Sequence, residues 1–213
     1  LPGGGTVSFV SPWGHSYSDR IESREEAGTP NVVGDIRVAL AMLVKEALGQ
    51  DWLDSRQRQL RHRAESIWSR NPRLDLLGQT LPNALPIFSF RVRDGRGGYL
   101  HQQFFTRLLS DVAGIQARGG CACAGSYAHR LLGLDAAQSE ALRRAISAGR
   151  ELDKPGWVRL NLSALMADEK ADQIIGAVDS LAFSASDHQS RYRADPATAR
   201  FVPVDTDKET LAS

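Results

Sequence analysis

The chain has 213 residues, of which 42% are hydrophobic and 24% are charged, and its formal net charge at pH 7 is +1. This is an ordinary soluble composition that gives no electrostatic reason to expect a nucleic-acid partner. No apolar run approaches the roughly 18 residues that span a bilayer, and no signal peptide is visible. The only cysteines, Cys121 and Cys123, are too few for a disulfide framework, which favours a reducing, cytoplasmic location.

Residues 1–30 are rich in Gly, Ser and Pro and lack helical periodicity, so we expect loops with one short strand at Thr6–Val10. A helix is predicted from Pro30 to Leu48, because proline suits the first helical position. Thr29 is a competent N-cap for this helix and Gly49 is a natural stop. Its predicted apolar face consists of Val33, Ile36, Leu40, Leu43, Val44 and Ala47.

A second helix is predicted from about Asp51 to Ser69. The residues expected to face inward are Leu53, Leu60, Ala64 and Ile67. Four arginines crowd the middle of this helix, at positions 56, 58, 61 and 63. Such a stripe can bind nucleic acid, but because acids are scattered beside it we interpret it as a solvated face.

Strands and helices alternate in the rest of the chain. Strands are expected at Leu74–Leu77, Pro86–Val92, Gly114–Arg118 and Trp157–Leu162. Helices are expected at Leu100–Val112, shortly after Gly125, at Ala136–Ala148 and at Ala167–Phe183. Residues beyond about Ser186 are polar and aperiodic, and we predict an extended or mobile tail. The alternation indicates the α/β fold class.

Two glycine-containing clusters occur near the start of the chain. The first is Gly3-Gly4-Gly5-Thr6, whose amides could face an anion, although three glycines alone are more typical of a flexible turn. The second is Glu26-Ala27-Gly28-Thr29-Pro30-Asn31. Here Gly28 permits a close backbone approach, Thr29 offers a hydroxyl, and a helix N-terminus follows, which together suit a phosphate oxygen. The spacing is equally compatible with Thr29 only capping its own helix.

A third cluster, Arg118-Gly119-Gly120-Cys121-Ala122-Cys123-Ala124-Gly125, places thiols in a glycine-rich loop. An exposed cysteine near a cation and a helix N-terminus is typically more reactive than a buried one, which favours chemistry at Cys123. A Cys-x-Cys pair supplies only two metal ligands and the five histidines show no zinc spacing, so we predict no metal site. A disulfide across one intervening residue would be strained.

Taken in this order over residues 1–185, the three clusters resemble the carboxyl-terminal half of the class V aminotransferase family of fold-type I pyridoxal-phosphate enzymes. The Arg-x-Gly-x-x-Cys-Ala run that begins at Arg118 is most like the cysteine desulfurases. The resemblance implies that residues 1–50 end a large cofactor-binding domain and provide a linking helix. It implies a small α/β domain, a short sheet covered by helices, in residues 51–185, and an extended tail in residues 186–213.

The resemblance also implies roles for individual residues. Gly28 and Thr29 match the segment that reaches across a homodimer interface to the partner's pyridoxal 5'-phosphate, with Gly3, Gly4 and Gly5 in the same neighbourhood. Cys123 matches the desulfurase nucleophile, which attacks the sulfur of a cysteine substrate, retains it as a persulfide and leaves alanine.

Two arginines are matched to the substrate. Arg159 matches the arginine that binds the α-carboxylate, although without the family pattern a surface strand arginine would be the better interpretation. Arg118 matches a supporting arginine that shapes the site. Cys121 has no counterpart in the pattern. The implied partners are a second copy of the chain, a small amino-acid substrate and a sulfur-acceptor protein.

The lysine that binds the cofactor covalently in this family has no match among Lys45, Lys154, Lys170 and Lys208. We therefore expect the biological start to lie upstream of Leu1 and this chain alone to be inactive, as a truncated form, a split or frame-shifted gene product, or half of a longer enzyme. Two alternatives remain open. One is another class V activity, such as an aminotransferase, epimerase or lyase, and the other is a non-catalytic module that dimerises.

Overall fold

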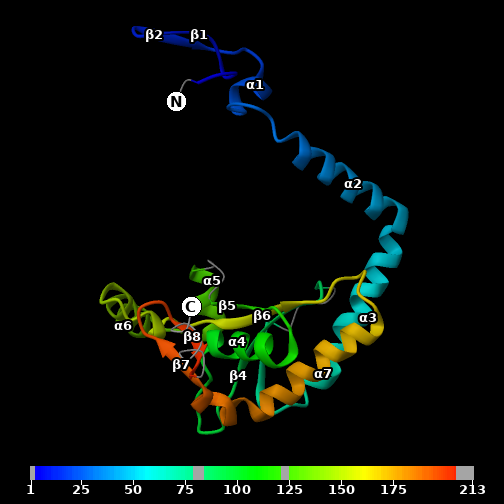
Figure 1. The fold of residues 1–213 in the computed structure, drawn as a ribbon, viewed down its shortest axis with the longest axis vertical. Coiled ribbons are helices and arrows are strands. Elements are labelled where there is room, and N and C mark those ends of the chain that lie inside the picture. Colours follow the sequence, from blue (N-terminus) through cyan, green and yellow to red (C-terminus); the bar gives the residue numbers. More distant parts are fainter. Residues whose placement is uncertain (1–2, 79–83, 121–124, 205–213) are drawn as a thin grey trace, which may run out of the picture. The chain divides into compact units, whose positions relative to one another are not determined.

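The computed structural model describes residues 3–78, 84–120 and 125–204. The chain divides into two compact units, residues 1–52 and residues 53–213. Figure 1 shows the elements in chain order, from β1 near the N-terminus to β8.

The first unit contains a β-hairpin and two helices. Its elements are β1 (Val7–Ser11), β2 (Gly14–Tyr17), α1 (Ile21–Glu25) and α2 (Val32–Leu48). The predicted first strand is present as β1, and it pairs antiparallel with β2, which was not predicted. The structure places the start of α2 two residues later than predicted, because Asn31 is its N-cap and accepts a hydrogen bond from the Gly34 amide at 3.1 Å. The prediction that Thr29 caps this helix is therefore wrong.

The second unit contains a four-stranded antiparallel sheet with the order β3-β4-β6-β5. The strands are β3 (Leu74–Leu77), β4 (Ile87–Val92), β5 (Arg118–Gly120) and β6 (Trp157–Asn161). The helices are α3 (Gln50–Trp68), which begins in the first unit, α4 (Gln102–Ala113), α5 (Gly125–Leu132), α6 (Ala136–Ser147) and α7 (Asp168–Ser184). A mixed α/β fold with a short sheet and helices confirms the predicted class.

The hydrophobic core lies on one face of this sheet. Alternate residues of the two central strands, Phe88, Phe90, Val158 and Leu160, are buried against α3, α4 and α7. The Trp68 indole of α3 lies 4.8 Å from the Phe88 ring and donates a hydrogen bond from Nε1 to the Ile175 carbonyl of α7 at 3.0 Å. The intervening residues of the strands therefore project from the opposite face, called the open face here.

Two predictions about local structure need correction. The strand predicted at Gly114–Arg118 is found at Arg118–Gly120. Gly114 instead ends α4 in the left-handed conformation (φ 65°), and the Ile115 amide bonds back to the Leu109 carbonyl. On α3, Ile67 is 36% exposed, whereas Trp68 is fully buried in the position that follows Leu60 and Ala64 at i+4 spacing.

Residues 186–204 do not form the extended tail that was predicted. They belong to a 3-10 segment (Ala185–Arg191) and an antiparallel hairpin of β7 (Tyr192–Asp195) and β8 (Arg200–Pro203). The hairpin packs on α4, where the Phe104 ring lies 5.5 Å from Tyr192 and 5.6 Å from Phe201. The turn is closed by Asp195, which accepts hydrogen bonds from Ala197 and Thr198.

The open face carries a cluster of one acid, Asp75, one tyrosine, Tyr99, and two arginines, Arg91 and Arg93. The Asp75 carboxylate accepts hydrogen bonds from Arg91 Nη2 at 2.6 Å and from the Tyr99 hydroxyl at 2.7 Å. The Arg91 guanidinium carbon lies 3.9 Å from the Tyr99 ring centroid. Burial acts to raise the pKa of Asp75, but the hydrogen bonds from Tyr99 and Arg91 outweigh it and hold that pKa below its ordinary value.

The docking of the hairpin on α4 can be tested by replacing Phe104 with alanine. Phe104 is 2% exposed, so Phe104→Ala should lower the free energy of unfolding by about 3–5 kcal/mol, measured by urea denaturation. Phe183→Ala is the matched control because that side chain is 52% exposed. Equal losses for the two variants would contradict the described packing.

The Asp75 cluster predicts a pH-dependent contribution to stability. A carboxyl group whose folded-state pKa is depressed contributes its stability above its unfolded-state pKa and loses it as the pH falls through the folded-state value. Between about pH 6 and about pH 3, the wild-type chain should therefore lose more free energy of unfolding than the Asp75→Asn variant. Asp187→Asn, at an exposed position, should track the wild type. Parallel curves for Asp75→Asn and the wild type would rule out this contribution.

Candidate functional site

Arg159 and Arg118, both predicted to bind substrate, are neighbours across two strands. Arg159 of β6 lies directly opposite Ser89 of β4 on one side and opposite Arg118 of β5 on the other. Directly opposed residues of antiparallel strands project from the same face of a sheet. Among the described residues, neither guanidinium has a carboxylate or carbonyl partner. Two opposed cations disfavour each other, so an anion between them would be stabilised.

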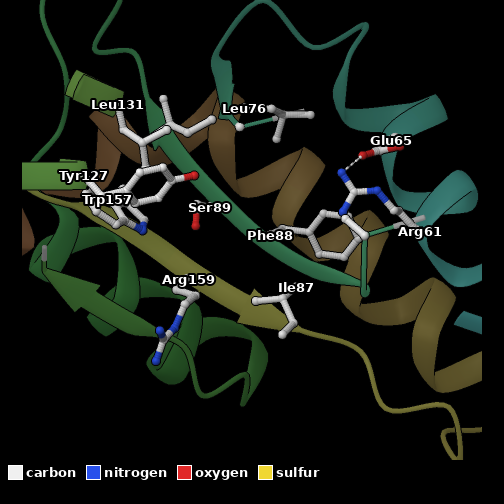
Figure 2. Close-up of a pocket in the computed structure, with 13 residues that line it drawn as sticks. Arg61, Glu65, Leu76, Ile87, Phe88, Ser89, Tyr127, Leu131, Trp157 and Arg159 are labelled. Atoms are coloured by element: carbon white, nitrogen blue, oxygen red, sulfur yellow. Dashed lines mark ion pairs between the residues drawn. The ribbon is translucent and has the colours of Figure 1, made fainter. Parts of the chain in front are cut away.

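A cavity of about 330 Å³ lies beside Arg159. Figure 2 shows Tyr127 and Leu131 of α5 on one side of it and Leu76, Phe88 and Arg61 on the other. Arg61 is already satisfied, because it forms an ion pair with Glu65 at 2.6 Å and donates a hydrogen bond to the Leu85 carbonyl. Arg159 is therefore the cation in this lining that remains available for a ligand, within the described part of the chain.

The lining of the cavity joins a polar part to an apolar part. The polar part contains Ser89, Tyr127, Trp157 and Arg159, and the apolar part contains Leu76, Leu77, Ala84, Ile87 and Leu131. This volume and this mixture are typical of a site for a small ligand that carries one charged group.

The predicted nucleophile, Cys123, lies outside the described residues, as does Cys121. The described residues on either side of them belong to β5, which pairs with β6, and to α5, and both β6 and α5 contribute residues to the cavity lining. Gly120 pairs with Trp157 of β6, and Gly125 begins α5. The backbone just before β6 lies close to the end of β5, because a Cβ atom on Gly156 would be only 2.7 Å from the Gly120 carbonyl carbon. Reactivity of Cys123 remains a prediction.

The first two glycine clusters form one local structure in the first unit. The Gly28 amide donates a hydrogen bond to the Gly4 carbonyl at 3.2 Å, and the Thr6 hydroxyl bonds the Gly3 carbonyl at 2.9 Å. Gly5 and Gly28 have φ angles of 86° and 85°, a left-handed conformation that disfavours side chains. The predicted cofactor-binding residues Gly4, Gly5 and Gly28 are therefore brought together.

Thr29 extends from this structure toward solvent. Because Asn31 caps α2, the Thr29 hydroxyl is not used for capping, and it has no hydrogen-bond partner among the described residues. Gly28 offers backbone conformation but no amide, since its N–H is bonded to Gly4. The segment thus fits a phosphate group through the amide and hydroxyl of Thr29, with Gly28 and Gly5 shaping the backbone.

The sequence patterns did not indicate four polar residues of the cavity, namely Glu65, Ser89, Tyr127 and Trp157, and Arg61, which also lines it, had been assigned to a solvated face. The alternation of β6 was a signal for one of them, because residues 157 and 159 must share a face of the sheet. The register that brings Ser89 opposite Arg159 depends on the pairing of distant strands. Tyr127 depends on how α5 is placed, which no local pattern specifies.

His101 is a histidine with a structural role. Its Nδ1 accepts a hydrogen bond from the Gln103 amide and caps α4, and its ring lies 5.3 Å from Phe201. Burial lowers the pKa of His101, an effect that the nearby Leu152 backbone partly offsets. The neutral imidazole suits this capping role, because only a deprotonated Nδ1 can accept the amide hydrogen.

Over residues 3–78, 84–120 and 125–204, none of the helices combines the length and apolarity needed to cross a membrane. Over the same ranges, no three side chains of His, Cys, Asp or Glu are grouped so that they could hold a metal ion.

Comparisons with solved structures identify similar folds. The apo cysteine desulfurase from Thermococcus onnurineus NA1 superposes with a TM-score of 0.62 at 24% identity, covering 86% of this chain and 39% of that protein. The cysteine desulfurase CsdA (S-sulfonic acid) from Escherichia coli superposes with a TM-score of 0.54, also at 24% identity, covering 87% of this chain and 38% of that protein. The chain thus spans well under half the length of either protein. None of the curated proteins matches its sequence.

The sequence also matches the family described as aminotransferase class-V, over residues 1–160. The match includes both glycine clusters, the cysteine-containing segment and Arg159. Because it extends over most of the 213 residues, the protein belongs to the class V aminotransferase family.

Proposed function

We propose that this chain is the carboxyl-terminal part of a pyridoxal-phosphate-dependent, cysteine desulfurase-like enzyme, and that the cavity beside Arg159 binds the α-carboxylate of its amino-acid substrate. The observation that carries the proposal is that Arg159 lines the cavity and has no hydrogen-bond or ion-pair partner among the described residues. The residue is half-buried, the cavity is of ligand size, and Arg118 lies opposite Arg159 across the sheet.

Arg159 is suited to a carboxylate by its geometry. A guanidinium donates two parallel hydrogen bonds to both carboxylate oxygens and so fixes the orientation of the bound group. Arg118 adds positive potential beside it without competing for the same lone pairs. The apolar wall formed by Leu76, Leu77 and Ile87 reduces contact with water, which strengthens these charge interactions.

The family to which the chain belongs implies pyridoxal 5'-phosphate as the cofactor. In the proposal, Thr29 binds the cofactor phosphate through its amide and hydroxyl, and Gly4, Gly5 and Gly28 shape the backbone around it. This segment would serve the partner subunit of a homodimer. The bound cofactor supplies an electron sink for bonds broken at the substrate. None of the four lysines here matches the family's cofactor-binding lysine, so we propose that activity requires the remainder of a longer protein.

The sulfur-transfer step is assigned to Cys123. Its thiolate attacks the sulfur of the cysteine substrate, forming a sulfur–sulfur bond while the carbon–sulfur bond breaks. The electron pair of the broken bond remains with the carbon, which is later protonated to give alanine. The sulfur remains on Cys123 as a persulfide until a thiol acceptor, proposed to be a partner protein, removes it.

Replacing Cys123 with serine tests this assignment in the longer protein that contains the chain. Cys123→Ser should abolish sulfide release from L-cysteine in the presence of a reducing thiol, because serine cannot retain the sulfur. Cofactor absorbance should be unchanged. Cys121→Ser, two residues away, is the matched control and should retain activity. Sulfide release by Cys123→Ser at the wild-type rate would show that the nucleophile is misassigned.

Two observations distinguish the proposed desulfurase from the alternatives, which are a non-catalytic remnant and another class V activity. A reading frame continuous with this chain that encodes a Ser-x-His-Lys-like motif upstream supports an intact enzyme, whereas an in-frame stop supports a non-catalytic remnant. A cysteine-dependent change in cofactor absorbance followed by a detectable persulfide indicates a desulfurase. The same absorbance change with keto-acid formation and no persulfide indicates an aminotransferase.

Arg159→Ala should weaken binding of the amino-acid substrate about 10- to 100-fold, because hydrogen bonds to a charged group are lost. The measurement is the KM of the longer protein for L-cysteine, with fluorescence of the bound cofactor as a check on loading. Arg58→Ala is the control, since Arg58 is an exposed arginine of α3 that does not line the cavity. An unchanged KM in Arg159→Ala would remove the carboxylate assignment.

A further inference from the structure

Trp157 has a buried hydrogen-bond donor with nothing to bond. The residue is 3% exposed, and its indole Nε1 has no acceptor among the described residues. Trp68, the other deeply buried tryptophan, shows the usual arrangement, with its Nε1 bonded to the Ile175 carbonyl at 3.0 Å. Buried polar groups are nearly always paired, because an unmet donor costs the free energy of its lost hydration. The unpaired Nε1 therefore needs an explanation.

The position of Trp157 indicates which acceptor would meet this donor. Trp157 and Arg159 are separated by one residue on β6, so their side chains leave the same face of the sheet. Both line the same cavity, together with Ser89, which lies opposite Arg159. In Figure 2 the indole nitrogen lies on the edge of the Trp157 ring that is nearer to Ser89 and Arg159. The unmet donor and the unpaired guanidinium thus belong to one site.

We propose that Trp157 is a substrate-binding residue, whose indole N–H donates a hydrogen bond to the carboxylate held by Arg159. This inference rests on the proposed function, and it assigns a second donor to that carboxylate. A carboxylate has about four lone-pair sites, of which a guanidinium fork uses two, so an N–H can be accepted from the side. Unlike a second cation, an indole donates without adding repulsion to Arg118 and Arg159.

The arrangement also gives the site selectivity for charge. A ligand without a carboxylate would leave the Trp157 donor and the Arg159 guanidinium unpaired in a partly apolar cavity. A site built to hydrogen-bond a particular group discriminates strongly against analogues that lack it, because its own polar groups are then desolvated without compensation. A resident water bonded to Nε1 is the competing explanation, and it predicts no response of Trp157 to a carboxylate.

Nuclear magnetic resonance of the 15N-labelled chain tests the inference directly. The chain has four tryptophans and therefore four indole N–H signals, which single substitutions assign. L-Alanine, the amino acid that the proposed reaction would leave, is the probe. The Trp157 signal should shift downfield and saturate, while the hydrogen-bonded Trp68 signal stays in place. L-Alaninamide, which lacks the carboxylate, should leave the Trp157 signal unmoved.

Trp157→Phe provides the second measurement, because it removes the N–H and keeps an aromatic ring. It should weaken L-alanine binding about tenfold, followed through the backbone amides of Ser89 and Arg159. Trp68→Phe is the matched control: it removes a bond that is formed, so it should lower the thermal midpoint and leave L-alanine affinity unchanged. A purely structural role for Trp157 predicts the opposite pattern, with lower stability and unchanged affinity.

The outcomes separate this inference from the proposed function. If L-alanine binds in a manner that Arg159→Ala abolishes, but the Trp157 signal does not move, the inference is overturned and the carboxylate assignment of Arg159 stands. If no Arg159-dependent binding of L-alanine is found, both are overturned. A Trp157 shift that also occurs with L-alaninamide would show that the donor does not recognise the carboxylate.

Discussion

The register of three antiparallel strands is the constraint on which the candidate site depends. It places Ser89, Arg159 and Arg118 in one row across β4, β6 and β5. The register is held by the core on the other face, because a slip of one residue would send Val158 and Leu160 to the open face and Arg159 into hydrocarbon. Gly156 adds a second restraint, since a side chain there would meet the Gly120 backbone.

Arginines on the open face of the same sheet occur in two opposite environments, one with partners from the fold and one without them. Arg91 is held by Asp75 and stacks on Tyr99, so its charge and its planar surface are both used within the fold. Arg159 and Arg118 are left without such partners in the part of the chain that is described, although the sheet could have carried an acid opposite them. Folded proteins depart from local consistency in this way chiefly at functional sites, where a ligand supplies the missing group. The contrast is the strongest structural argument for an anion at Arg159.

Much of the fold could be predicted from the sequence because the main signals are local. The periodicity of α3 and the alternation of β4 predict each element and most of its buried face, with Ile67 of α3 as the exception. The errors arose where local signals compete or are absent. Gly114 was counted within a strand although it ends a helix, and the hairpin at Tyr192 and Phe201 was missed because its stability comes from Phe104, far away in sequence. For the site, Arg159 and Cys123 were predicted from the resemblance to the family's ordered motifs, and the role of Cys123 stays a prediction because it lies outside the described residues. The positions of Trp157 and Tyr127 in the cavity lining required the three-dimensional arrangement.

The two parts of the proposed machinery depend on different physical supports. Every residue of the hydrophobic core cluster, from Leu60 to Ala185, belongs to the second unit, so the Arg159 cavity is held by packing within that unit. The Thr29 segment instead depends on backbone hydrogen bonds between two glycine turns, and α2 beside it buries none of its side chains. A helix with many apolar residues, such as Val33, Ile36 and Leu43, gains most of its stability from packing against a partner. Loss of a partner would therefore weaken the Thr29 segment first, while leaving the Arg159 cavity with the packing that holds its register.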